Sequence, residues 1–143
     1  MPRLESFLPY KLSIASNAVS DRIAREYQSR FGLRISEWRI MAVLGDSGPM
    51  TPRALAQATL MDKVAVSRAC RTLEARALAM RTPHDRDGRS HMLALTETGR
   101  DVFEEIMAHA IAIESELFET LEPDERVTLA GLLDRVHAKA RES

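Results

Sequence analysis

Residues 81–99 read RTPHDRDGRSHMLALTETG, a pattern typical of a basic β-hairpin that runs directly into a helix. Strand-compatible residues flank a polar tip, and Asp87-Gly88 supplies the residue types that a tight hairpin turn requires. The tip carries Arg86 and Arg89, which have little to pack against on a protruding loop. Because a narrow minor groove of DNA attracts guanidinium groups, the segment predicts a DNA-binding wing. A solvated surface hairpin is the alternative.

The segment before the hairpin has the layout of a helix-turn-helix. Thr51-Pro52 combines a capping residue with proline at the first helical position, which predicts a short helix to about Ala58. After a connection at residues 59–61, Asp62 caps a second helix. Its inward face is predicted from three- and four-residue spacing to be Val66, Ala69, Cys70, Leu73 and Ala77. Its outward face is largely basic and polar, and comprises Lys63, Val64, Ser67, Arg68, Arg71 and Thr72.

Longer helices are predicted on both sides of this segment. Apolar residues repeat at helical spacing over residues 8–31, and Ser36 is the expected N-cap of the helix that follows. Further helices are expected to begin at Thr96 and Pro123. Their apolar stripes are too long for a small winged domain to cover, so we expect them to pack against a second copy of the chain. A helical bundle within one chain is the alternative.

The expected fold is therefore mainly α with a small β-wing. A winged helix-turn-helix DNA-binding domain is expected at residues 34–96, flanked by a dimerisation region of long helices at residues 8–31 and 97–141.

Composition is consistent with a globular protein of one ordinary domain, because 45% of its 143 residues are hydrophobic and 29% are charged. No apolar run is long enough to span a bilayer and the N-terminus does not resemble a signal peptide, so we expect a cytoplasmic protein. The net charge of −1 divides unevenly: residues 1–61 and 62–96 carry +3 each, whereas residues 97–143 carry −7. This asymmetry would orient the molecule on a polyanion.

These features together resemble the MarR family of winged helix-turn-helix transcriptional regulators, over nearly the whole chain. The motifs that carry the resemblance are Phe31-Gly-Leu, Ser36-Glu-Trp-Arg, Leu55-Ala, Val66-Ser-Arg, Leu73-Glu74, Asp87-Gly-Arg89 and Leu95-Thr96-x-x-Gly99-Arg100. The resemblance implies a homodimer that binds a pseudo-palindromic operator in double-stranded DNA, usually as a repressor. It also implies release of the operator on binding a small ligand or on oxidation.

The resemblance assigns roles to individual residues. Arg89 resembles the wing arginine that enters the minor groove, and Asp87 resembles the acid that orients it. Ser67 and Arg68 match positions that contact the major groove or its phosphates. The full set of expected DNA-binding residues is Arg53, Lys63, Val64, Ser67, Arg68, Arg71, Arg86, Asp87 and Arg89.

The contacts of these residues are open to alternatives. Arg68 is able to pair with guanine, although arginine on a helix more often contacts phosphate. Arg53, Lys63 and Arg71 are candidate phosphate clamps, with solvated charge as the alternative.

The chain departs from the family where relatives commonly have glycine. It has Thr59-Leu60-Met61 in the helix-turn-helix turn and Ala77 after the recognition helix. Because a left-handed alanine costs roughly 1 kcal/mol, we expect this helix to end differently or to run slightly on.

The expected signal is a small aromatic or amphipathic anion, such as an aromatic acid or an acyl-CoA thioester. It would bind between the dimerisation helices and the winged domain, because pockets form where packing units meet. The candidate lining residues are Asn17, Trp38, Met41 and Met107. Ordinary core packing is the alternative for the last three, and solvation is the alternative for Asn17.

Other functions fit the sequence less well. Cys70 falls on an apolar stripe, which favours a buried inert thiol over a redox switch. His84 with Asp85 is a weak metal candidate, and no cofactor or metal site is expected. The sequence has no Gly-rich phosphate loop and no nucleophile elbow, so an enzyme is not expected. The remaining alternatives are a redox- or metal-responsive regulator of the same fold and a helical interaction module that does not bind DNA.

Overall fold

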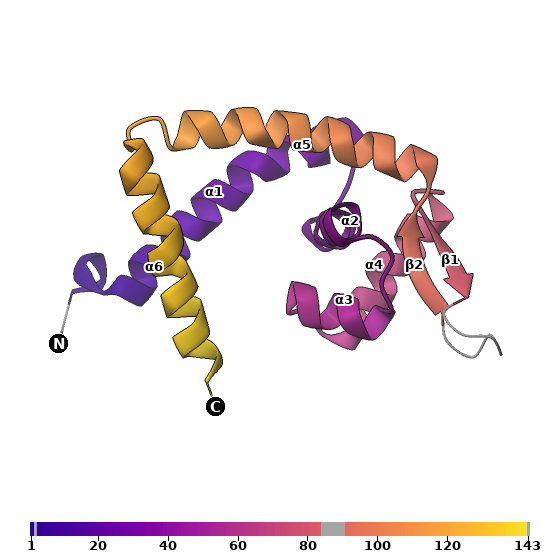
Figure 1. Cartoon of the computed structure of the whole chain (residues 1–143), viewed down its shortest axis with the longest axis horizontal. Helices are drawn as coiled ribbons and strands as arrows, with labels where there is room; N and C mark the ends of the chain where they lie inside the picture. Colours follow the sequence, from indigo (N-terminus) through magenta and orange to yellow (C-terminus); the bar gives the residue numbers. More distant parts are fainter. Residues whose placement is uncertain (2, 84–90, 143) are drawn as a thin grey trace. The chain divides into compact units, whose positions relative to one another are not determined.

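A computed structural model of the chain describes residues 1, 3–83 and 91–142. The chain divides into two compact units, residues 1–110 and residues 111–143. The described elements in chain order are η1 (Leu4–Ser6), α1 (Leu8–Phe31), α2 (Ile35–Ser47), α3 (Pro52–Thr59), α4 (Lys63–Ala75), β1 (Ala79–Pro83), β2 (His91–Leu95), α5 (Glu97–Leu117) and α6 (Pro123–Arg141) (Figure 1). The mainly helical fold with a small β-wing is confirmed. Among the described residues, no helix is both long and apolar enough to cross a membrane.

The start of α2 differs from the prediction that Ser36 is its N-cap. The helix begins at Ile35, and Arg34 is the N-cap. The Arg34 N–H donates to Oε1 of Glu37 at 3.0 Å, so the carboxylate satisfies a free amide at the positive end of the helix. Glu37 is buried at 5% exposure, and this contact gives its charge a partner. The Glu37 carboxylate, three residues after the cap, therefore sets the start of α2, and Ser36 does not cap the helix.

The helix-turn-helix is confirmed at α3 and α4. Thr51 Oγ1 accepts from the Ala54 N–H at 3.1 Å, and Asp62 Oδ1 accepts from the Ala65 N–H at 2.8 Å. Each cap satisfies an amide that has no partner within its helix. The turn passes through Leu60 in the left-handed region, with φ of 58°.

The end of α4 contradicts the expectation for Ala77. This residue is exposed rather than on the inward face, and it adopts the left-handed conformation with φ of 59°. The Ala77 N–H donates to the Glu74 carbonyl at 3.0 Å, and the Leu78 N–H donates to the Leu73 carbonyl at 2.9 Å. This Schellman motif satisfies two carbonyls at the helix end and turns Leu78 into the core at 5% exposure. These gains offset the strain of a left-handed alanine.

The predicted hairpin is confirmed in its two strands. β1 pairs with β2 antiparallel, and Arg81 lies opposite Leu93 in the register. Met50 extends this sheet, because its N–H donates to the Leu93 carbonyl at 3.0 Å and its carbonyl accepts from the Leu93 N–H at 2.7 Å. The turn residues at the tip, Asp85 to Ser90, lie outside the described residues.

The core of the first unit joins the helix-turn-helix to the neighbouring helices. Figure 1 shows α2, α3 and α4 gathered beside the hairpin. Tyr27 of α1 stacks on Trp38 of α2 with ring centroids 5.5 Å apart, and Trp38 stacks on Phe103 of α5 at 5.9 Å. The largest fully buried side chains are Leu33, Ile40, Met41, Leu44, Leu55, Val66, Leu73, Leu93 and Ile106.

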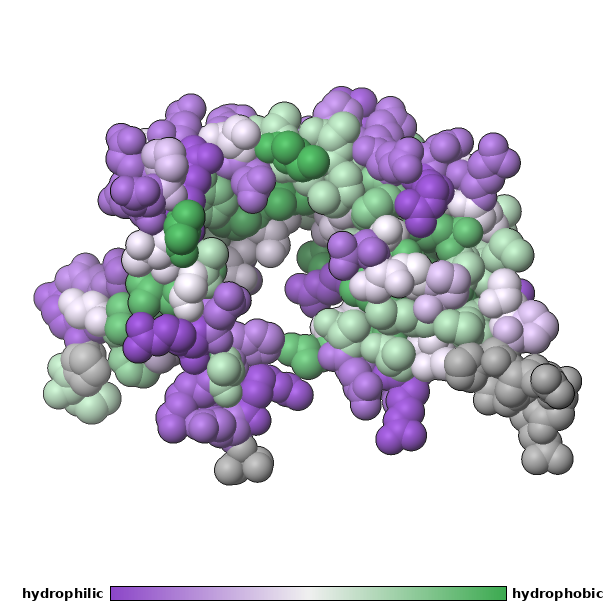
Figure 2. All heavy atoms as spheres, in the orientation of Figure 1, coloured by the Kyte–Doolittle hydropathy of each residue, from purple (hydrophilic) through white to green (hydrophobic). Residues whose placement is uncertain are grey.

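Hydrophobic side chains also remain exposed, on the two terminal helices and before α1. Figure 2 shows green hydrophobic residues at the surface among purple ones. The exposed large residues near the N-terminus are Met1, Leu4, Phe7, Leu8, Tyr10, Leu12 and Ile14, and those on α6 are Val127, Leu132, Leu133 and Val136.

Candidate nucleic-acid interface

The outer face of α4 presents the residues that the sequence predicted. Lys63, Val64, Ser67, Arg68 and Arg71 are all exposed, and Thr72 is half-buried. Val64 has 63% of its surface exposed, although it is apolar. Because the opposite face is anchored in the core, α4 is a rigid support for these side chains.

A basic groove lies beside this face, between α3, α4 and the two strands, with a volume of about 680 Å³. Its lining includes basic and polar side chains from α3, α4 and both strands. They are Arg53, Gln57, Lys63, Ser67, Arg81 and His91. No acidic residue is among the described residues that line it, so the groove favours an anion. The structure thus brings Arg53, Lys63 and Ser67 to one place.

Sequence reasoning missed Arg81 and His91. Arg81 is held by Glu74 of α4, whose Oε1 lies 2.6 Å from the Arg81 Nε. Burial does not alternate along β1 and β2, and His91 lies on the same face as buried Leu93, so no local pattern marks these two residues.

The other predicted DNA-binding residues are not gathered in the groove. Val64, Arg68 and Arg71 are exposed on α4 outside its lining. Arg86, Asp87 and Arg89 lie outside the described residues, as do His84 and Asp85.

Cys70 lines the floor of the groove and is 4% exposed. The pKa of its thiol is raised to about 11, mainly by burial and also by the Glu74 carboxylate, whereas Arg81 opposes the shift. The thiol is therefore protonated at neutral pH, whereas a redox-sensing cysteine reacts as the thiolate. These properties support the interpretation of Cys70 as an inert core residue.

The four candidate ligand residues lie in different environments. Met41 is fully buried in the core, Trp38 and Met107 are half-buried, and Asn17 is exposed on α1. Trp38 already stacks on both sides, on Tyr27 and on Phe103. Asn17 is ten residues from Tyr27 on α1, a rise of about 15 Å, so it does not join this aromatic stack.

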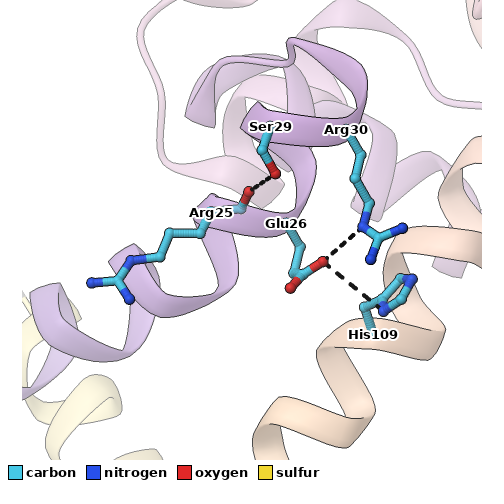
Figure 3. Close-up of polar contacts among 5 residues, drawn as sticks. All are labelled: Arg25, Glu26, Ser29, Arg30 and His109. Carbon is cyan, nitrogen blue, oxygen red and sulfur yellow. Dashed lines mark hydrogen bonds and ion pairs between the residues drawn. The ribbon is translucent and has the colours of Figure 1, made fainter.

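A polar cluster also links α1 to α5. Figure 3 shows Glu26 of α1 between Arg30 and His109, with its Oε2 at 2.9 Å from the Arg30 Nε and at 3.9 Å from the His109 Nδ1. In the same view the Ser29 hydroxyl donates to the Arg25 carbonyl at 2.5 Å. His109 therefore lies at a contact between helices, on neither the groove nor the outer face of α4.

Comparison with known proteins gives consistent results. A sequence profile described as MarR family matches residues 31–90, from the end of α1 into the hairpin. The HTH-type transcriptional regulator YwaE of Bacillus subtilis is 25% identical over 139 residues, which are 93% of this chain and 81% of that protein.

Solved structures are similar over almost the full length. The crystal structure of a MarR/EmrR family transcriptional regulator from Acinetobacter sp. ADP1 has a TM-score of 0.86 and 27% identity, covering 97% of this chain and 98% of that one. BpsR of Bordetella bronchiseptica, whose DNA binding is regulated by 6-hydroxynicotinic acid, has a TM-score of 0.72 and 25% identity, covering 89% and 98%.

Proposed function

Since this chain belongs to the MarR family of transcriptional regulators, we propose that it binds an inverted-repeat operator in double-stranded DNA as a homodimer. The observation that carries the proposal is the exposed basic face of α4, which continues into a groove where none of the described lining residues is acidic. An α-helix fits the major groove of B-DNA, and its exposed cations would meet the phosphates on either side.

We assign the contacts by the chemistry of each side chain. Arg68 reads a base from the centre of the exposed face, and Val64 offers an apolar contact to a thymine methyl group. Arg53, Lys63, Ser67 and Arg71 contact phosphates, and the groove accepts one phosphate beside Arg81 and His91. In the wing, Arg89 enters the minor groove with Asp87 orienting it, and Arg86 contributes to the same contact.

The dimerisation region is proposed to comprise residues 8–31 and 97–141, and the DNA-binding domain residues 34–96. Exposed apolar side chains on α1 and α6 support this division, because such a surface is stabilised when a second copy covers it. A twofold dimer would also place two α4 helices side by side on one face of the DNA.

Repression and its release by a small molecule are also part of the proposal. The regulation of BpsR by 6-hydroxynicotinic acid supports an aromatic or amphipathic anion as the ligand class. Trp38 and Met107 are the better candidates for contacting it, because both are partly accessible. Met41 would require the core to open, and Asn17 is about 15 Å along α1 from Tyr27, the residue that stacks on Trp38. Cys70 does not favour oxidation as the signal, because its thiol is buried and protonated.

Selection of bound sequences from random duplex DNA tests the proposal. We expect an inverted repeat whose half-site centres lie about 10–10.5 bp apart, one turn of the double helix. Inserting five base pairs between the half-sites turns them to opposite faces of the DNA and should abolish tight binding. Recovery of a non-symmetric sequence, or tolerance of the insertion, would contradict a twofold dimer.

Arg68→Ala and Lys63→Ala are expected to weaken DNA binding in different ways. Loss of a base contact should cost about 1–3 kcal/mol and relax the preference at one position of each half-site. Loss of a phosphate contact should weaken binding to all sequences and reduce the dependence of affinity on salt concentration. Titrations of both variants against the selected operator and its single-base variants, at two salt concentrations, measure these effects. Unchanged affinity in both variants would refute the docking of α4.

A further inference from the structure

Residue 76 occupies the turn where α4 ends, immediately before the left-handed Ala77. Arg76 is the C-cap of α4, with φ of −89° and ψ of 4°. Its side chain is exposed and reaches the end of α1. The family resemblance and the sequence pattern assign this residue no role.

The guanidinium of Arg76 binds the carbonyl end of α1. Its Nη2 donates to the Phe31 carbonyl at 2.5 Å, and its Nη1 donates to the Gly32 carbonyl at 3.5 Å. Other carbonyls at the end of α1 are already paired with backbone amides. The Gly32 N–H donates to the Gln28 carbonyl, and the Leu33 N–H donates to the Tyr27 carbonyl. Arg76 therefore supplies donors and a positive charge at the negative pole of α1.

The same short turn also holds the start of α5. The Thr96 hydroxyl donates to the Ala77 carbonyl at 2.6 Å, and the Thr96 N–H donates to the Leu78 carbonyl at 3.1 Å. Residues 76–78 thus connect α4 to both α1 and α5. We call this turn with its contacts to Phe31, Gly32 and Thr96 the α4 junction.

We infer that Arg76 is a positioning residue for DNA binding, which sets the orientation of α4 relative to α1 through the α4 junction. The inference rests on the proposed function, in which α1 belongs to the dimerisation region. If a second copy of the chain packs on α1, the angle between α1 and α4 determines how far apart the two α4 helices lie. Arg76 then affects simultaneous binding of two half-sites without contacting DNA.

The test compares duplexes that need both α4 helices with duplexes that need one. Arg76→Gln, Arg76→Lys and the full-length wild-type protein are titrated against the selected operator and against the same duplex with one half-site scrambled. We expect Arg76→Gln to lower operator affinity about tenfold and half-site affinity less than twofold. The affinity gained when the second α4 helix also binds depends on how the two helices are placed. Arg76→Lys should restore part of the loss, since an ammonium group is able to bind one carbonyl. Arg39→Gln, which removes an exposed arginine of α2 outside the dimerisation region and the proposed DNA contacts, is the matched control and should leave both affinities unchanged.

A second measurement does not depend on DNA. Amide hydrogen exchange of Gly32 and Leu33, at the end of α1, should become faster in Arg76→Gln and remain unchanged in Arg39→Gln. Equal loss of affinity on both duplexes would overturn the inference, because it would show that Arg76 contacts DNA itself. Unchanged operator affinity or unchanged exchange would overturn it as well. If the wild-type protein binds no duplex while exchange still responds to Arg76→Gln, the α4 junction forms but the proposed function and the positioning role both fail.

Discussion

Replacing Leu132 and Val136 by glutamate is expected to separate the proposed dimer into monomers and to lower operator affinity at least about a hundredfold. Both side chains are apolar and about half exposed, and they lie four residues apart on one face of α6. In a twofold interface each substitution occurs twice, so four unpaired carboxylates would have to be desolvated. Light scattering should show the mass falling from about twice to once the 16.0 kDa of the chain.

The control for this variant is Ala130→Glu with Ala138→Glu. It adds the same charge to exposed positions of α6 away from the face that carries Leu132 and Val136. We expect it to keep the mass and the operator affinity of the wild-type protein. A wild-type protein that is monomeric at micromolar concentration would contradict the dimer, and with it the inverted-repeat operator.

Gly99→Ala is expected to destabilise the fold by about 3 kcal/mol. The added methyl group would overlap with backbone atoms, which cannot move aside as easily as a flexible side chain. A Cβ at position 99 would lie 1.9 Å from the Leu78 carbonyl oxygen, so the first turn of α5 and the α4 junction would have to separate. The Gly99 N–H donates to Thr96 Oγ1 at 2.9 Å, and this cap would be disturbed by the same movement. Thermal unfolding at a fixed protomer concentration should show a midpoint lower by roughly 10 °C.

Gly131→Ala is the matched control for this substitution. A Cβ at position 131 of α6 meets nothing within 4 Å, and alanine has a higher helix propensity than glycine. We expect its midpoint to equal or exceed that of the wild-type protein. If Gly99→Ala unfolds at the wild-type temperature, the close approach of α5 to Leu78 does not exist in solution.

Most of the secondary structure could be predicted from the sequence because its causes are local. Thr51 and Asp62 cap the helices that they begin, through contacts with amides three residues ahead. Periodic apolar residues indicated the bounds of α1 and the inward face of α4 as far as Leu73, but not the exposed Ala77. The prediction for Ser36 was wrong for an equally local reason, since a glutamate at position 37 caps the helix from the N3 position.

The candidate interface could be predicted only in part. Lys63, Ser67 and Arg68 follow from the periodicity of α4, because residues opposite a buried stripe must face outward. Arg81 and His91 were missed because their place in the groove depends on how the hairpin packs on α3 and α4. The predicted wing contacts of Arg86, Asp87 and Arg89 remain predictions.

The amino-acid sequence by itself determined the order of helices and strands, the caps at Thr51 and Asp62 and the basic face of α4, since each depends on residues within a few positions. Only the tertiary structure decided the α4 junction. Arg76 binds the Phe31 carbonyl from 45 residues away, and Ala77 adopts a left-handed conformation that its own propensity disfavours. The free energy that holds both comes from buried Leu78 and from contacts with α1 and α5, which no local pattern contains.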